Sequence, residues 1–135
     1  MAAVLRVSGP TFDVARFVVQ SRWTFLRTFQ AGRSVHTTFP DRVANESGFV
    51  VSVSEAGLDE FDRQIVEATQ FLKQYSEQLR QLWTNSDVLN VTIDFAIAMK
   101  QTVTISVHFP ASLVELAGPL GISLEASFYP VSQPH

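Results

Sequence analysis

Seven apolar side chains recur at steps of three and four residues between Asp59 and Trp83, and this stripe most constrains the fold. The stripe comprises Phe61, Ile65, Ala68, Leu72, Tyr75, Leu79 and Leu82. The spacing predicts one continuous helix of about seven turns with a single apolar face. A coiled-coil seam has the same spacing, but about three heptads are few for one. We therefore expect the helix to lie across a β-sheet, which requires the same stripe.

Alternating apolar and polar residues predict a sheet beneath this helix. Strands are expected over residues 2–8, 34–39, 48–54, 89–99, 102–109 and 122–129, and shorter helices over 14–21 and 110–117. Only Lys100 and Gln101 separate the fourth and fifth of these strands, so we expect an antiparallel hairpin there. The run from Trp23 to Phe29 fits either a strand or an extension of the first helix.

These elements predict an α+β fold, a two-layer sandwich in which helices pack on one face of a mainly antiparallel sheet. The expected order is β-α-β-β-α-β-β-α-β within a single domain covering residues 1–135. Apolar residues make up 46% of the chain and charged residues 17%, which is typical of a globular domain.

The composition excludes several kinds of chemistry. The chain has no cysteine, so disulfides, thiolate metal sites and a cysteine nucleophile are excluded. Its six glycines do not form a nucleotide-binding loop, and its three histidines are too isolated for a local metal site. We expect neither a cofactor nor a metal. The N-terminus does not resemble a signal peptide and no apolar run could span a membrane, so a bacterial cytoplasmic protein is expected.

Charge is distributed unevenly along the chain. Residues 1–42 carry a net charge of +4 with six arginines, whereas residues 43–135 carry −7. The total of −3 indicates no general affinity for nucleic acid. The arginines either form a patch for an anionic partner or, as we favour, only solvate the surface.

The polar face of the expected hairpin holds the best candidate site. Pairing around Lys100 would place Asp94 near Ser106 and Thr92 near His108, and Glu125 and Tyr129 would join if the last strand is adjacent. A carboxylate beside an imidazole is the minimum for general acid–base catalysis. Any solvated sheet face carries similar residues, and nothing in the sequence buries or activates these groups. A binding role is therefore favoured over catalysis.

A second candidate surface is the aromatic cluster of Trp23, Phe25 and Phe29, with Arg22 and Arg27 interleaved. This pattern is typical of a protein interface or a nucleic-acid stacking surface. It is equally typical of aromatic residues packed in a core, which is the interpretation we favour.

Several segments together resemble a bacterial domain family of unknown function. They are residues 47–54, Phe71-Leu72, Leu79 and residues 89–95, followed by the closing segments 109–113, 116–122 and 124–130. The resemblance covers about residues 47–130 and consists mainly of core and turn positions. It implies a fold and assigns no catalytic residue.

Three classes of function follow from these observations. The first is a non-enzymatic bacterial interaction module, for instance an immunity-type protein that neutralises a toxin, or a phage-encoded or accessory binding protein. Its acidic body would meet a basic partner. The second is a small-ligand binder or minor enzyme that uses the face around Asp94, His108 and Glu125. The third is a protein that self-associates as a dimer through an edge strand or the long helix. A protein partner is expected, and neither nucleic acid nor membrane.

Overall fold

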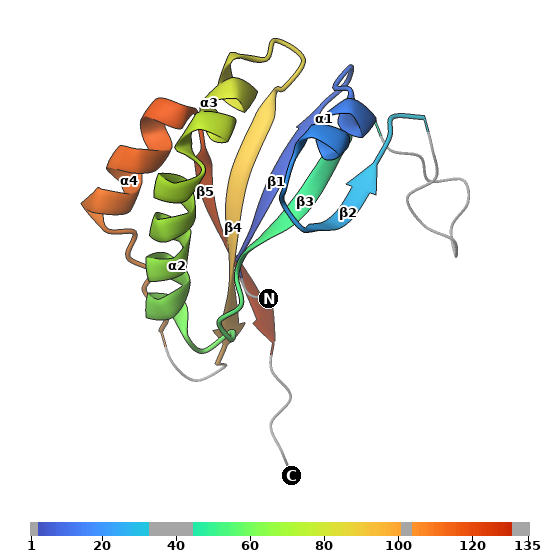
Figure 1. The fold of residues 1–135 in the computed structure, drawn as a ribbon. Coiled ribbons are helices and arrows are strands. Elements are labelled where there is room, and N and C mark those ends of the chain that lie inside the picture. Colours follow the sequence, from blue (N-terminus) through green and yellow to red (C-terminus); the bar gives the residue numbers. More distant parts are fainter. Residues whose placement is uncertain (1–2, 33–44, 101–103, 131–135) are drawn as a thin grey trace.

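The computed structural model describes residues 3–32, 45–100 and 104–130, which form one five-stranded sheet with four α-helices packed on one face (Figure 1). In chain order the elements are β1 (Ala3–Gly9), α1 (Val14–Gln20), β2 (Phe25–Phe29), β3 (Ser47–Ser54), α2 (Phe61–Gln74), α3 (Ser76–Thr84), β4 (Asn90–Met99), α4 (Ala111–Ala117), a 3₁₀ turn η1 (Gly118–Leu120) and β5 (Ser123–Pro130). The predicted α+β class, with a mainly antiparallel sheet and helices on one face, is confirmed. The strand predicted over residues 34–39 lies outside the described residues.

The strand order is β2-β3-β1-β4-β5, and only the β4–β5 pair is parallel within the described sheet. The predicted hairpin is wrong, because residues 104–109 form no strand. Both edges of β4 are already occupied, one by β1 and the other by β5, so no edge is left for a hairpin partner. The chain instead crosses over through α4 and returns beside β4, as a parallel pair requires.

The predicted long helix is present as two consecutive helices. Tyr75 leaves helical geometry, with φ −111° and ψ 24°, and separates α2 from α3. Its N–H donates to the Phe71 carbonyl and its carbonyl accepts from Leu79, so the hydrogen bonding continues across the break. The apolar stripe therefore keeps its register, and Leu72 and Leu79 are both buried against the sheet.

Aromatic rings fill the core between β3 and the helices. Phe49 is fully buried and lies 5.0 Å from Phe17, 5.1 Å from Phe25 and 6.0 Å from Trp23, measured between ring centroids. Trp23 is 8% exposed and also contacts Phe71 and Tyr75 of the long helical segment. The core interpretation of Trp23 is therefore confirmed. Phe25–Phe29 is a strand, which resolves the choice between strand and helix.

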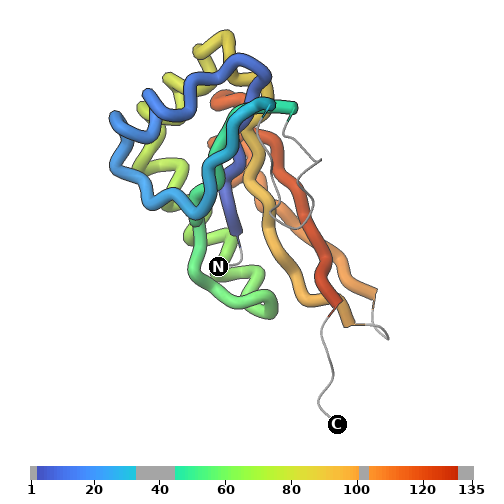
Figure 2. The backbone as a smooth tube through the Cα atoms, turned by 90° about the vertical axis from the view of Figure 1, so that its right-hand side faces the viewer, coloured from blue at the N-terminus to red at the C-terminus, as the bar shows by residue number. Residues whose placement is uncertain are grey.

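Among the described residues, no helix lies on the opposite face of the sheet (Figure 2). We call this the helix-free face. At one end of the sheet, β4 and β5 continue past the end of β1. The pairing of β1 with β4 ends at Phe95, whereas β4 and β5 stay paired as far as Met99 and Pro130. Within the described part of the chain, no helix has the length and apolarity needed to cross a membrane.

Candidate functional site

Three strands bring four polar side chains together on the helix-free face. Alternation along the strands points Arg6 of β1, Asp94 of β4, and Glu125 and Ser127 of β5 away from the helices. The parallel register places Asp94 directly opposite Glu125, and Val4 of β1 lies opposite Asp94 on the other side. We call these four residues the Arg6 cluster.

Arg6 joins the two carboxylates of this cluster. Its Nη1 donates to Asp94 Oδ2 at 3.1 Å, and its Nη2 donates to Glu125 Oε2. Ser127 Oγ donates to the other Asp94 oxygen, Oδ1, at 2.7 Å. Asp94 is only 7% exposed, so its charge needs these partners, because an unpaired buried carboxylate is strongly unfavourable. The side chain of Glu125, by contrast, is 49% exposed.

A further carboxylate, that of Glu46, extends this polar surface along β1 and β4. Glu46, just before β3, accepts a hydrogen bond from Ser8 Oγ at 2.7 Å and from Asn90 Nδ2 at 3.4 Å. Glu46, Asp94, Glu125 and Arg6 together carry a net charge of −2. A basic partner would complement the charge of these four side chains.

The structure brings together some of the predicted site residues and separates others. Asp94 and Glu125 are neighbours as expected, and Tyr129 lies on the same face of β5, opposite Ala98. His108 does not lie opposite Thr92, because Thr92 pairs with Ser123, and Ser106 does not lie opposite Asp94. His108 is exposed in the segment before α4, and among the described residues no hydrogen bond or ion pair joins it to Asp94.

Arg22 and Arg27 belong to a different part of the molecule. They lie before and within β2, at the opposite edge of the sheet from β5. The Arg27 guanidinium lies 5.6 Å from the centroid of the Phe29 ring, a cation–π contact within its own strand. The two arginines therefore do not share a site with Asp94 and Glu125.

Sequence reasoning missed Arg6, the residue that connects the site. It counted Arg6 among the arginines of the N-terminal third and did not place it on a strand face. A signal was present, since Arg6 is the one charged residue in the alternating strand Ala3–Gly9. Its partners come from strands about 90 and 120 residues away, and their order in the sheet could not be read from local periodicity.

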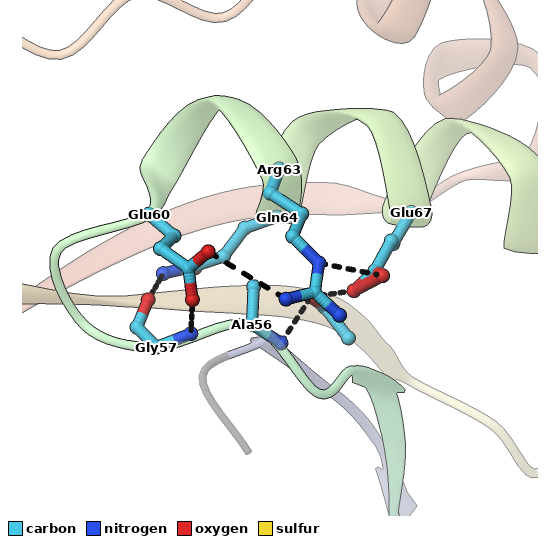
Figure 3. A network of polar contacts seen from close by, with 7 residues as sticks. Ala56, Gly57, Glu60, Arg63, Gln64 and Glu67 are labelled. Atoms are coloured by element: carbon cyan, nitrogen blue, oxygen red, sulfur yellow. Dashed lines mark hydrogen bonds and ion pairs between the residues drawn. The ribbon is translucent and has the colours of Figure 1, made fainter.

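A second polar network, at the junction of β3 and α2, has a structural role (Figure 3). Glu67 accepts from Ser54 Oγ at 2.6 Å and from Arg63 Nε at 3.3 Å. Glu60 accepts from the Gly57 N–H at 2.9 Å, and the buried Gln64 amide donates to the carbonyls of Gly57 and Ala96. These contacts hold the turn at Gly57 against the start of α2. The charged groups of the network are paired with one another.

The same network changes two pKa values. The hydrogen bond from Ser54 is the main reason that the pKa of the Glu67 carboxyl lies below its ordinary value, with Arg63 as a further cause. The nearby Glu67 and Glu60 carboxylates raise the pKa of the Arg63 guanidinium. Both shifts favour the charged forms, so this network is a salt bridge at neutral pH and does not hold a group poised for proton transfer.

A groove of about 490 Å³ lies between α2 and the β2–β3 edge. Its walls include Arg22, Trp23, Glu67 and Tyr75. Glu67 is already engaged by Ser54 and Arg63, and the Trp23 ring is buried beneath its neighbours. The remaining polar lining of the groove includes Arg22, Gln70 and Gln74. No set of three acidic or histidine side chains suited to a metal ion occurs among the described residues.

No family model matches the chain, and comparison with curated proteins and with solved structures gives no match either. The resemblance to a bacterial domain family therefore stays a prediction.

Proposed function

We propose that this protein is a non-enzymatic bacterial interaction module that binds a basic protein partner through the helix-free face of its sheet. An immunity-type role, in which the partner is a toxin that the module neutralises, is the form of this function that we favour. The observation that supports the proposal is the Arg6 cluster, in which one guanidinium serves two carboxylates.

The cluster suits binding because its two carboxylates differ in exposure. Asp94 is buried and fully engaged, so it holds Arg6 in place. Glu125 is half exposed and shares Arg6 with Asp94, so its negative charge is only partly compensated. A lysine or arginine of a partner could approach Glu125 without disturbing the buried pair. Around it, Ser123, Thr92 and Ala96 present a neutral surface.

Catalysis by the same face has less support. Both oxygens of Asp94 already accept hydrogen bonds, and His108 does not lie beside it. The minimum arrangement for general acid–base chemistry, an acid within hydrogen-bond distance of an imidazole, is therefore missing from the described residues. A ligand-binding or enzymatic function would need side chains other than the Asp94 and His108 pair.

The test is affinity capture from the native host with the wild-type chain, a Glu125→Lys variant and a matched Glu77→Lys control. Glu77 lies on α3 in the helix layer, with its side chain 72% exposed. We expect a basic protein that the wild type and the Glu77→Lys control retain and that Glu125→Lys loses. Higher salt should weaken retention, because the complementary charges are screened.

A partner that binds wild type and Glu125→Lys equally well would contradict the proposed surface. For the immunity-type role, expressing the captured partner should arrest growth, and coexpression of the wild-type chain should restore it. If the partner binds at this face without arresting growth, the surface stands and the immunity-type role does not.

A further inference from the structure

The outer edge of β5 is an unpaired strand edge within the described structure. β5 pairs with β4 on one side, and no described backbone group hydrogen-bonds to its other side. The opposite terminal strand, β2, has five residues and a register shift between Phe25 and Arg27, whereas β5 has eight residues in continuous register. Short, irregular edges resist the addition of a strand and long, regular edges accept it. β5 is therefore the edge suited to a further strand.

The side chains of β5 are arranged symmetrically about Ala126. Ser123, Glu125, Ser127 and Tyr129 lie on the helix-free face, and Leu124, Ala126 and Phe128 lie on the helix side. An antiparallel pair of β5 strands centred on Ala126 would place Leu124 opposite Phe128 of the second copy. It would also place Ser123 opposite Tyr129 and Glu125 opposite Ser127. Apolar residues would meet apolar residues and polar would meet polar, as an interface between identical copies requires.

Charge and backbone hydrogen bonding favour this register over registers that are shifted along the strand. Glu125 is the only charged residue of β5, and pairing centred on Ala126 sets it opposite a neutral serine. Pairing centred on Glu125 would oppose two like charges, which is destabilising. The Ala126 register also pairs Ser123–Tyr129 completely and leaves Pro130, which has no N–H to donate, outside the ladder.

We propose that two copies of the chain associate through antiparallel pairing of their β5 strands, centred on Ala126, into one continuous ten-stranded sheet. The contact would cover Phe128, which is 41% exposed in the single chain. It would also bring the two Arg6 clusters side by side, because Glu125 lies on the strand that forms the contact. The pairing does not depend on the proposed partner, but it would give that partner a doubled acidic surface.

Sedimentation equilibrium of the full chain tests the association. We expect a reversible dimer in the wild type and at least about tenfold weaker association in Phe128→Glu, since that change buries a charge in the contact. Val19→Glu is the matched control, because Val19 is an exposed apolar residue on α1, which packs on β2 and β3 at the other end of the sheet from β5. Circular dichroism must show that both variants are folded. A wild type that stays monomeric at all concentrations overturns the proposal.

Disulfide trapping tests the register without relying on a disruptive variant. The chain has no cysteine, so Ala126→Cys introduces a single thiol that would face its own copy at the twofold axis. Paired residues lie about 4.5–5.5 Å apart between Cα atoms, within the range of a disulfide. Ser123→Cys is the control, since in this register its thiols would be separated by about 20 Å.

We expect Ala126→Cys to form a covalent dimer under mild oxidation and Ser123→Cys to form no covalent dimer. A dimer that crosslinks through position 123 but not 126, or that is unaffected by Phe128→Glu, would mean that another surface associates and would reject the proposal. A wild type that captures the basic partner but stays monomeric would reject this inference alone and leave the proposed function standing.

Discussion

The two faces of the sheet differ in what holds them together. The helix-covered face is built from apolar and aromatic side chains such as Phe49, which no solvent reaches. The helix-free face is joined by polar contacts that span β1, β4 and β5, with Asp94 buried and Glu125 exposed. Burial of apolar area is the main source of stability, whereas exposed ion pairs contribute little. The comparison indicates that one face stabilises the fold and the other is available for recognition.

The largest expected effect is on the helix-covered face. Replacing Phe49 with Ala should lower the free energy of unfolding by about 3–5 kcal/mol, because its ring contacts Phe17, Trp23 and Phe25 in the core. Thr92→Ala on the helix-free face is the comparison variant, with an expected loss under about 1 kcal/mol. Urea denaturation followed by circular dichroism measures both. Similar losses for the two variants would remove the distinction between the faces.

An intermediate effect is expected at Arg6. Arg6→Ala removes the cation from the buried Asp94 and should cost about 1–3 kcal/mol of unfolding free energy. Arg80→Ala, which breaks only an exposed ion pair with Glu77, should cost at most about 1 kcal/mol. The same denaturation experiment applies.

A double-mutant cycle then assigns the cause of the Arg6 effect. In an Asp94→Asn background, Arg6→Ala should cost less, because no buried charge is left without a partner. An equal cost in both backgrounds would show that Arg6 acts through its packing and not through Asp94.

A smaller effect on stability is expected at Glu125. Glu125→Gln should change the free energy of unfolding by no more than about 1 kcal/mol, because the side chain is half exposed and its ion pair is screened by solvent. Binding of the captured partner should nevertheless weaken. A loss of stability comparable to that of Arg6→Ala would mean that Glu125 serves the fold and is not mainly a recognition group.

The smallest effect concerns the pH dependence of the β3–α2 junction. The pKa of Glu67 is lowered in the folded chain, so its contribution is fully present above the ordinary carboxyl pKa and is lost as the pH falls through the folded value. Ser54→Ala removes the largest cause of the shift and should raise the pKa of Glu67 towards its ordinary value. Carboxyl-carbon NMR titration measures this change, and an unaltered pKa would show that Ser54 does not hold the charged form.

Much of the fold could be predicted from local patterns, because those patterns report on burial. The stripe from Phe61 to Leu82 indicated the helical segment over the sheet, and the alternation of Leu89–Met99 indicated β4. The Asp13 side chain, just before α1, accepts from the Arg16 N–H at 3.1 Å, and aspartate is a preferred residue at that position of a helix. Each of these features depends on residues close in sequence.

The wrong predictions concern which strands lie next to each other in the sheet. Local sequence patterns carry no information about strand order. Residues 104–109 alternate as a strand would, and Ile105 and Val107 are indeed more buried than Thr104 and His108. Their segment nevertheless forms no ladder, because β5 occupies the edge of β4. The candidate site was therefore half predicted. Asp94 and Glu125 were placed on one surface, His108 was wrongly added to it, and Arg6, whose partners lie far along the chain, was missed.

Carboxyl footprinting of the chain, free and in complex with its captured partner, tests the central claim most directly. Glu125 and Glu77 both have exposed side chains and should both be labelled in the free protein. If the helix-free face binds the partner, the complex should protect Glu125 and leave Glu77 labelled. Protection of Glu77 on α3 with unchanged labelling of Glu125 would contradict the account and would place recognition on the helix layer.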